Sequence, residues 1–470
     1  DYWWKKTVTE REDIVGMDGS ILTHQDVLKA SGHVGGFSDP MSDCLLSRAR
    51  LRADQVPEQS GVAVWYSGAK HESTGWSTDT EFAVLVPEDK DPDSAKKTAR
   101  QFYGERMPDK KISPKELELI EEKREELDST TQFNPANGSL LTEPREFNLM
   151  FQTSVGASSD DGSIAYLRPE TAQSIFVQFK NILETSRQKL PFGIAQIGKA
   201  FRNEINPRNF TFRSREFEQM ETEFFCRGED GLRLTEEWLE ARLQFYGEIG
   251  IPREKLHVLD VPDGERAHYS SKTYDIEYDF PFGIQELEGV AYRTDYDLKK
   301  HGEASGKPIE YFDEQTKEKL IPHVVEPSAG CDRTVLAIIC EAFDEETVTN
   351  EKGKEETRTV MRFDPKMAPI KCGIFPLLKN KPELVDKARE VKELLLPFMN
   401  VFYDEAGAVG RRYRRQDEIG TPFCVTIDFD TLGEDGSDLE GTVTVRERDS
   451  MEQERVPIAE LPTYLLQKLI

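Results

Sequence analysis

The sequence predicts an α+β fold, in which an antiparallel sheet with flanking helices is followed by a C-terminal α/β domain. Residues 192–225 alternate with period two on both sides of a polar loop, which is typical of two paired strands. Apolar strands at 370–375 and 423–429 flank a helix predicted for 382–396. A chain of 470 residues suffices for two to four domains. The charged stretch at 344–365 is expected to be a hairpin tip or linker, so we expect one domain at 1–365 and another at 366–470.

The predicted hairpin carries charge in an ordered way. Its loop holds three arginines, and both strands present polar residues on one face. A hairpin of this kind suits a ligand that is anionic at one end and cationic at the other. The residues are Gln196, Gly198, Ala200, Arg202 and Glu204 on the first strand, Phe217, Gln219, Glu221 and Glu223 on the second, and Arg208, Arg213 and Arg215 in the loop.

The amino-acid sequence of this hairpin resembles that of a known family. The run RNEINPRNFTFRSREFEQME, residues 202–221, is similar to motif 2 of the class II aminoacyl-tRNA synthetases, and specifically to the glycyl-tRNA synthetases of the homodimeric type. The resemblance covers roughly residues 1–43 and 139–470. It implies an enzyme, an aminoacyl-tRNA ligase, that activates glycine with ATP and Mg²⁺ to glycyl-adenylate and transfers it to tRNA(Gly). It also implies a homodimer and a cytoplasmic location.

The N-terminal stretch supports the same resemblance. Paired tryptophans are followed by GMDGSILTH, SGH and FSDPM, which resemble segments of this family. A helix is predicted for residues 22–31, capped by Ser20 or Thr23. Family members carry a dimer-forming motif 1 before the tryptophans, and most of it is absent here. Because the chain begins at Asp1 without methionine, we expect the true N-terminus to lie upstream.

The resemblance implies an insertion at about residues 45–140 of the first domain, and this is the least informative part of the sequence. Charge periodicity predicts an amphipathic helix at residues 116–128. Arg52 matches a family arginine that reaches the amino acid, although an ordinary surface arginine is an equally good interpretation. By family architecture, we expect the insertion to contact the tRNA acceptor arm. Some relatives carry a C-x-x-C motif where this chain has residues 133–137, and its six cysteines form no such motif, so we predict no zinc.

Three further segments outside the hairpin carry candidate site residues on predicted strands or at the starts of predicted helices. In YLRPETAQ, Pro169 is predicted to start a helix with Glu170 in its first turn. There Glu170 is either favoured by the helix dipole or, as the resemblance implies, contacts the glycine ammonium. Glu286 and Glu288 are expected on one face of a strand, and Arg293 in the same run is a further pocket candidate. In HVVEPSAGCDR, Arg333 enters the first turn of a helix, a natural phosphate site. That helix is expected to bury Val335, Leu336, Ile338, Ile339 and Phe343.

The resemblance implies roles for named residues. Arg202 would clamp the α-phosphate and the glycine carboxylate, and Arg333 and Arg213 the γ-phosphate. Glu204 would accept a hydrogen bond from the adenine amino group, and Phe217 would stack on adenine. The catalytic residues are therefore expected to be Arg202, Glu204 and Arg333. The ATP site would comprise Arg202, Asn203, Glu204, Phe212, Arg213, Ser214, Arg215, Glu216, Phe217, Glu286, Leu287, Gly330, Cys331, Asp332 and Arg333, with Glu286 as the Mg²⁺ ligand. The glycine site would comprise Arg52, Glu170, Phe217, Glu218, Gln219, Met220, Glu221, Glu326, Pro327, Ser328, Ala329 and Gly330.

Charge and hydropathy limit the partners that the sequence suggests. The net charge of −27 argues against a general nucleic-acid binder, but a local basic cluster is predicted at Arg411, Arg412, Arg414 and Arg415. No apolar run approaches the ~18 residues of a membrane span, so no membrane contact is expected.

Two alternative functions would use the same core: a non-catalytic relative, or an amide-forming ligase that needs no tRNA. The presence of Arg202 and Arg333 disfavours a non-catalytic relative, and the anticodon-like C-terminal domain disfavours an amide-forming ligase.

Overall fold

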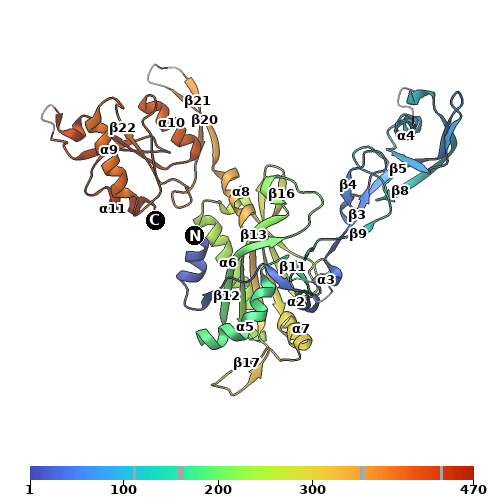
Figure 1. Cartoon of the computed structure of the whole chain (residues 1–470), viewed down its shortest axis with the longest axis horizontal. Coiled ribbons are helices and arrows are strands. Elements are labelled where there is room, and N and C mark those ends of the chain that lie inside the picture. The colour runs from blue at the N-terminus through green and yellow to red at the C-terminus, as the bar shows by residue number, and fades with distance from the viewer. Residues whose placement is uncertain (109–112, 157–162, 350–352, 354, 435–437, 470) are drawn as a thin grey trace. The chain divides into compact units, whose positions relative to one another are not determined.

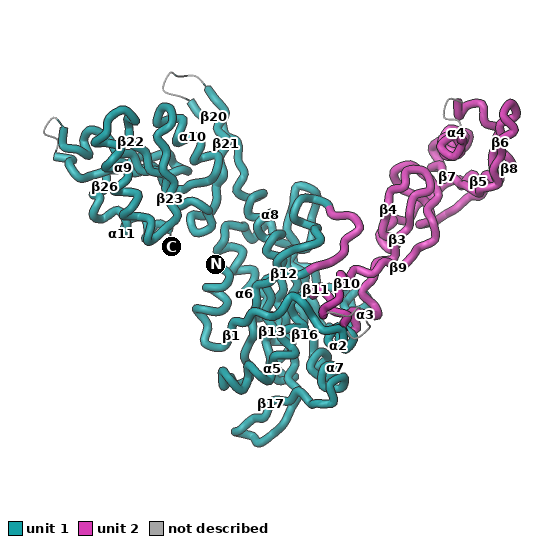
Figure 2. Tube along the Cα trace, viewed as in Figure 1, with its two compact units in different colours: residues 1–31, 170–200, 208–470 teal, residues 32–169, 201–207 magenta. Residues whose placement is uncertain are grey.

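A computed structural model describes residues 1–108, 113–156, 163–349, 353, 355–434 and 438–469. The chain divides into two compact units (Figure 2). The first comprises residues 1–31, 170–200 and 208–470, and the second comprises residues 32–169 and 201–207. The boundary predicted at 365/366 falls inside the first unit and stays a prediction.

The first unit is organised around a seven-stranded sheet (Figure 1). The four pairs from β13 to β14 are antiparallel, and the edge strand β1 pairs in parallel with β12. This is the antiparallel sheet that the alternating hairpin pattern predicted. In spatial order the strands are β1 (Ile14–Gly16), β12 (Phe192–Phe201), β13 (Glu216–Cys226), β19 (His323–Gly330), β16 (Gly283–Thr294), β15 (Lys272–Phe280) and β14 (Leu256–Asp260).

Helices cover both faces of this sheet. On one face α6 (Gly231–Glu248) packs its buried Trp238 and Leu243 against strand residues such as Phe224 and Val290. On the other face α5 (Ala172–Ser186) buries Phe176 and Phe179 in a cluster that includes Leu298 of α7 (Tyr296–Ser305). Each face is closed by apolar side chains over part of its area, which leaves buried polar residues of β13, β16 and β19 together in the rest.

Two predicted helices of the first unit differ from expectation near their ends. Residues 22–31 form a short strand, β2 (Leu22–His24), and then α2 (Gln25–Ala30), whose N-cap is His24 rather than Ser20 or Thr23. The His24 ring accepts a hydrogen bond from the Asp26 backbone N–H, so an imidazole replaces the expected hydroxyl cap. Likewise α5 begins at Ala172 after the N-cap Thr171, and Glu170 precedes the helix instead of lying in its first turn.

The helix that follows β19 buries a different face from the predicted one. In α8 (Cys331–Ala342), Ile338 is buried with Thr334, Ala337 and Ala342, whereas Val335 and Ile339 are 49% and 43% exposed, and Phe343 just beyond the helix is 55% exposed. Sequence periodicity identifies an apolar stripe but does not say which of two adjacent stripes faces the sheet.

The C-terminal part of the first unit has its own sheet and core. Three parallel strands and two antiparallel strands form a five-stranded sheet. An apolar core that includes Ile374, Leu384 and Val425 lies between sheet and helices, which confirms the predicted α/β architecture. The strands are β23 (Val401–Tyr403), β22 (Cys372–Pro376), β24 (Phe423–Ile427), β25 (Thr442–Glu447) and β26 (Gln453–Pro457), and the helices are α9 (Pro382–Leu395), α10 (Val409–Ile419) and α11 (Leu461–Leu469).

Small elements complete the first unit. The charged stretch after α8, expected as a hairpin tip or linker, forms an antiparallel hairpin of β20 and β21, whose tip lies partly outside the described residues. The remaining bounds are α1 (Tyr2–Trp4), β17 (Tyr311–Phe312), β18 (Lys319–Leu320), β20 (Phe343–Thr349) and β21 (Glu355–Met361).

The second unit contains the segment expected as an insertion. The residues predicted as a charged helix at 116–128 are instead a strand, β8, which pairs antiparallel with β5. Helix-forming glutamates yield here because two 13-residue strands exchange a long backbone ladder, so tertiary pairing overrides local propensity. The elements are α3 (His33–Gly36), β3 (Ser38–Asp43), β4 (Arg50–Arg52), β5 (Gln59–His71), β6 (Trp76–Thr78), β7 (Phe82–Val86), α4 (Ala95–Gly104), β8 (Glu118–Thr130), β9 (Arg145–Asn148), β10 (Phe151–Ser154) and β11 (Ile164–Leu167).

Candidate active site

Polar residues of three neighbouring strands meet on the α5 face of the sheet. The register pairs Glu221 of β13 with Ser328 of β19, and Glu326 of β19 with Ala291 of β16. Since paired residues share a face and side chains alternate, Gln219, Glu221 and Glu223 lie beside Glu326, Ser328 and Gly330. This is the common face that the sequence predicted for each strand separately.

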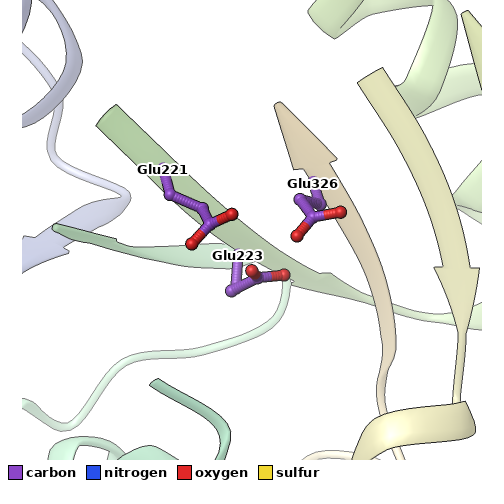
Figure 3. A group of neighbouring side chains, drawn as sticks. All are labelled: Glu221, Glu223 and Glu326. Atoms are coloured by element: carbon purple, nitrogen blue, oxygen red, sulfur yellow. The ribbon is translucent and has the colours of Figure 1, made fainter. Parts of the chain in front are cut away.

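Three buried carboxyl groups form the centre of this face, and we call Glu221, Glu223 and Glu326 the carboxylate cluster (Figure 3). One oxygen of each lies within 4.8 Å of the others. Glu221 accepts hydrogen bonds from the Ser328 hydroxyl at 2.8 Å and from the Thr171 hydroxyl. The N-terminus of α5 therefore helps to fix Glu221.

A buried arginine balances part of this charge. Arg293 of β16 is 1% exposed and donates from Nη1 to Glu326 Oε1 at 2.7 Å. Its Nε and Nη2 donate to Asp297 at 2.8 and 2.9 Å, so one cation is shared by two carboxylates. The Tyr269 ring lies 3.8 Å from the guanidinium carbon. The site therefore keeps an excess of acidic groups.

Glu170 belongs to the same neighbourhood. Gln173 donates from Nε2 to Glu170 Oε1 at 2.8 Å and to Asp297 Oδ1 at 3.3 Å. The His301 ring in turn contacts Gln173 Oε1 at 2.7 Å. This amide connects the segment before α5 to α7, so Glu170 is held without being part of either helix.

Burial and mutual repulsion shift the acidities of these groups. Burial raises the pKa of Glu326 to about 8, with Glu221 and Glu170 adding to the rise and Arg293 opposing it. Burial and Glu170 likewise raise the pKa of Glu221, against its two hydroxyl donors. Carboxylates that gain little from being ionised together are poised to accept a cation or a proton.

A β-bulge divides two glutamates that were expected on one face. Ile276 of β15 pairs with Glu288 of β16, whereas the next residue, Glu277, pairs with Glu286, so Leu287 is an extra residue. Glu288 therefore faces α6, where it pairs with buried Arg242 at 2.6 Å. The prediction of a shared face is wrong because one extra residue inverts the alternation.

The bulge leaves Glu286 on the same face as the carboxylate cluster, next to Asp275 and Glu277. Burial, Glu286 and Glu277 raise the pKa of Asp275 to about 7. These three carboxylates present oxygen donors of the kind that Mg²⁺ prefers. The donor set is compatible with the predicted role of Glu286.

Arg333 lies in the first turn of α8, as predicted. Its Nε donates to the Phe212 carbonyl at 3.1 Å, and its Nη1 lies 3.2 Å from Glu286 Oε2. The guanidinium carbon is 4.4 Å from the Phe212 ring. Asp332 is tied down separately, because its carboxylate accepts the Glu218 backbone N–H at 2.8 Å. A partly exposed arginine beside the first N–H groups of a 12-residue helix suits a phosphate.

The hairpin loop is ordered by its own backbone. Arg208 and Arg213 exchange two backbone hydrogen bonds, at 3.1 and 3.2 Å, and the Ser214 hydroxyl donates to the Glu216 carbonyl. Glu216 also pairs with Lys199 across the hairpin. The tip residue Phe210 has φ of 54° and is 92% exposed. The arginines of this loop therefore stand at the rim of the sheet rather than in its core.

Four predicted residues belong to the second unit. β12 ends at Phe201, so Arg202 and Glu204 follow the strand instead of sharing its face. Arg202 Nε donates to the Pro169 carbonyl at 3.1 Å, Asn203 N–H donates to the Leu149 carbonyl, and Glu204 is 8% exposed.

Arg52 is engaged by acidic partners within the second unit. It pairs with Asp54 at 2.6 Å and with Asp39 at 3.1 Å, and the Asp54 contact raises the pKa of Arg52. Its place in the glycine site stays a prediction.

Some predicted residues turn their side chains away from the carboxylate cluster. Met220 and Ala329 are buried in the core under α6 because they occupy alternate positions on their strands, and the bulge residue Leu287 is buried in the same core. Phe217, Pro327 and Cys331 lie next to site residues along the chain. The fold thus separates the predicted runs into side chains on the site face and side chains in the core.

Sequence reasoning missed most of the supporting contacts. Thr171, Gln173, Asp297 and Tyr269 hold the carboxylates and Arg293, yet none was singled out. Arg293 itself is a pocket candidate from the sequence, and the structure places it beside Asp297 and Glu326.

The predicted basic cluster in α10 is only partly a surface feature. Arg412 is 1% exposed and donates to the Pro376 and Gly407 carbonyls at 2.6 and 2.9 Å. Arg414 pairs with Glu356 and Arg415 with Asp404. Arg412 therefore supports the domain from inside, because its neighbours leave backbone carbonyls that need donors.

No helix among the described residues has the length and apolar character needed to cross a bilayer.

Comparison with known proteins places both regions in families. Residues 151–342 match the family described as tRNA synthetase class II core domain (G, H, P, S and T). Residues 371–468 match the family described as Anticodon binding domain. The sheet carrying the carboxylate cluster and the C-terminal five-stranded sheet fall largely within these two matches.

Full-length relatives are consistent with both matches. The chain is 44% identical to Glycine--tRNA ligase of Thermobifida fusca, over 99% of this chain and 88% of that protein. It is 46% identical to Glycine--tRNA ligase of Clostridium perfringens, over 99% and 89%. It is 42% identical to that of Streptomyces coelicolor, over 100% and 89%. At this identity and coverage, the chain belongs to the glycine–tRNA ligase family of class II synthetases.

Proposed function

We propose that the chain activates glycine with ATP and transfers it to tRNA(Gly). The observation that carries this proposal is the buried carboxylate cluster, which Arg293 and two hydroxyl groups hold in place. On the same face of the sheet lies Glu286, which contacts Arg333. An acid-rich end and a cationic end suit an amino acid at one and a triphosphate at the other. The chain's membership of the glycine–tRNA ligase family selects glycine among amino acids.

At the acidic end, the glycine ammonium would be bound by Glu221 and Glu326. An ammonium group offers three donors, and ionised acceptors strengthen such bonds. Glu170, held by Gln173, would supply a further acceptor. Ser328 and Thr171 fix Glu221, so the acceptors would be placed before glycine arrives, which reduces the cost of ordering them.

At the cationic end, Arg333 would hold the γ-phosphate together with Arg213. Arginine stays charged and bonds two oxygens at once. Glu286, with Asp275 and Glu277 beside it, would hold Mg²⁺, which neutralises phosphate charge when bound. Because no enzyme nucleophile is required, the residues act by positioning the glycine carboxylate against the α-phosphate and by stabilising the developing charge.

Arg202 would contact the α-phosphate, and Glu204 would accept a hydrogen bond from the adenine amino group. The insertion strands of the second unit are proposed to contact the tRNA acceptor arm, and the C-terminal domain the anticodon. We further propose a homodimer of cytoplasmic location that needs no zinc. These statements rest on family membership and on the motifs at residues 202–221 and 323–333.

Two assays separate this function from its alternatives. Glycine-dependent exchange of pyrophosphate into ATP is expected for the chain, and its absence would favour a non-catalytic relative. Glycylation of tRNA(Gly) transcripts is expected next. Exchange without tRNA charging would favour an amide-forming ligase and would overturn the second half of the proposal.

A further inference from the structure

Glu223 stands out among the buried acidic residues of the site. It lies on β13 two residues beyond Glu221 and is 0% exposed. Neither of its carboxyl oxygens has a hydrogen-bond partner among the described residues. An ionised carboxylate in such a place loses the hydration of both oxygens without compensation. On this strand the predicted glycine site comprises residues 217–221 and does not include Glu223.

The surroundings of Glu223 are acidic. Glu221 and Glu326 each place a carboxyl oxygen within 4.8 Å, and Figure 3 shows the three carboxyl groups turned toward one another. Burial, Glu326, Glu221 and Asp297 raise the pKa of Glu223 well above its usual range, against the lowering effect of Arg293. One cation thus faces four acids contributed by β13, β19 and α7.

The hydrogen bonds decide which acid is neutral. Glu221 receives two hydroxyl donors, from Thr171 and Ser328, and Glu326 receives the Arg293 guanidinium. Donors of this kind stabilise the ionised form. Glu223 receives none, and like charges at this separation resist ionising together. A proton added to the cluster therefore costs least on Glu223.

We propose that Glu223 is a positioning residue that stands as a neutral carboxylic acid and donates its O–H to the carboxylate of Glu221 or Glu326. This inference rests on the proposed glycine site and adds a residue to it. The donated bond would satisfy an oxygen that faces away from glycine, fix the rotamer of its partner and leave the remaining lone pairs for the ammonium. The uncharged acid would also limit repulsion in the empty site.

Such a residue differs from an ammonium ligand in its response to substitution. Glutamine keeps the shape, the neutrality and a donor, whereas alanine removes the donor and leaves a void. A third ionised ligand would instead require the negative charge, and glutamine would then fail like alanine. A buried metal ion held by all three glutamates would equally require the charge.

Infrared difference spectroscopy tests the protonation state without any need for activity. After treatment with a chelator at pH 7, the spectrum of the wild-type chain minus that of Glu223→Gln should contain the carbonyl band of a protonated carboxylic acid. Growth on ¹³C-glutamate should shift that band. Glu240→Gln, at an exposed glutamate of α6, is the matched control and should yield carboxylate bands alone. Carboxylate bands alone from Glu223→Gln would overturn the proposal, even where pyrophosphate exchange persists.

Steady-state exchange supplies the second arm. Glu223→Gln is expected to hold the glycine KM within about threefold of wild type, while Glu223→Ala raises it by about tenfold with a smaller change in kcat, the loss of one buried hydrogen bond to a charged group. The KM for ATP should stay equal to that of wild type in both variants. Equal KM increases for glutamine and alanine, with both variants folded by their melting curves, would contradict a neutral positioning acid and leave the proposed function standing.

Discussion

Two buried ionic groups in this molecule are built in opposite ways. In the C-terminal domain, Asp417 is 0% exposed and receives Arg358 Nε at 2.9 Å and Arg446 at 2.9 and 3.1 Å. In the catalytic sheet, Glu326 and Asp297 share the guanidinium of Arg293, and Glu223 has no partner among the described residues. In the first group both oxygens of Asp417 are bonded to guanidinium groups. The second group has acids in excess.

The contrast separates a structural role from a binding role. A fully paired buried ion pair holds its surroundings in one arrangement, and removing one partner leaves the other charge uncompensated. A cluster with too little positive charge is costly to the fold until a cation enters. The glycine ammonium supplies that cation under the proposed function, so substitutions in the two groups should have opposite consequences for stability and for substrate affinity.

The largest effect is expected from Asp417→Ala. It leaves the buried guanidinium groups of Arg358 and Arg446 without their carboxylate, which should cost about 3–5 kcal/mol of unfolding free energy. Thermal and urea unfolding would measure the loss. Glycine KM in pyrophosphate exchange, measured below the transition, should stay near that of wild type. An unchanged melting temperature would remove the structural half of the contrast.

Arg333→Ala is next. Removing the guanidinium should reduce exchange by about 10²–10³-fold, which is typical for a lost charge-stabilising donor. Arg333→Lys keeps a charge without the two-point contact and should recover only part of the rate. Arg202→Ala tests the matching prediction for the second unit in the same assay. Near-normal exchange with either alanine variant would refute the role of that arginine.

Glu286→Gln tests the proposed Mg²⁺ contact. Loss of one anionic oxygen should raise the Mg²⁺ concentration for half-maximal exchange by about tenfold, consistent with a weakened cation site. Glu288→Gln is an instructive comparison, because the bulge directs that side chain to Arg242 and α6. It should lower the melting temperature and leave the Mg²⁺ requirement unchanged. The reverse pattern would show that the alternation was assigned to the wrong residue.

A smaller effect is expected in the pH dependence of stability. The folded-state pKa of Asp275 is about 7, above its ordinary value of 3.8, because of burial and the neighbouring Glu286 and Glu277. The stability of its neutral form is therefore fully present below pH 3.8 and lost as pH rises through 7. Glu277→Gln removes one repelling charge from this partly exposed group and should reduce the loss between about pH 4 and pH 7 by about half a kcal/mol. Melting curves across this range provide the measurement, and a steeper loss would contradict the prediction.

Local patterns in the sequence predicted the antiparallel sheet, the C-terminal α/β architecture and the faces of several strands. The alternation in residues 217–223 and 326–330 placed Glu221 and Ser328 correctly because neither strand contains an irregularity there. The same reasoning failed at Glu288, since one inserted residue inverts a strand and carries no local signature. It failed at residues 116–128 because the partner strand lies about sixty residues away.

The contacts that hold the site were less accessible. Thr171, Gln173 and Asp297 come from helix ends and loops, and they become neighbours only when α5 and α7 pack on the sheet. The residue runs that suggested ATP and glycine sites also could not separate Met220 from Gln219. That distinction is made by the register of three strands together.

The most direct test is the glycine KM of Glu221→Gln in pyrophosphate exchange, alongside its melting temperature at pH 8. Losing the charge from a bond to the ammonium should raise KM by about 10- to 100-fold, while the melting temperature stays equal to that of wild type or rises. A KM unchanged from wild type in a folded variant would contradict the assignment of the carboxylate cluster to the amino group of glycine.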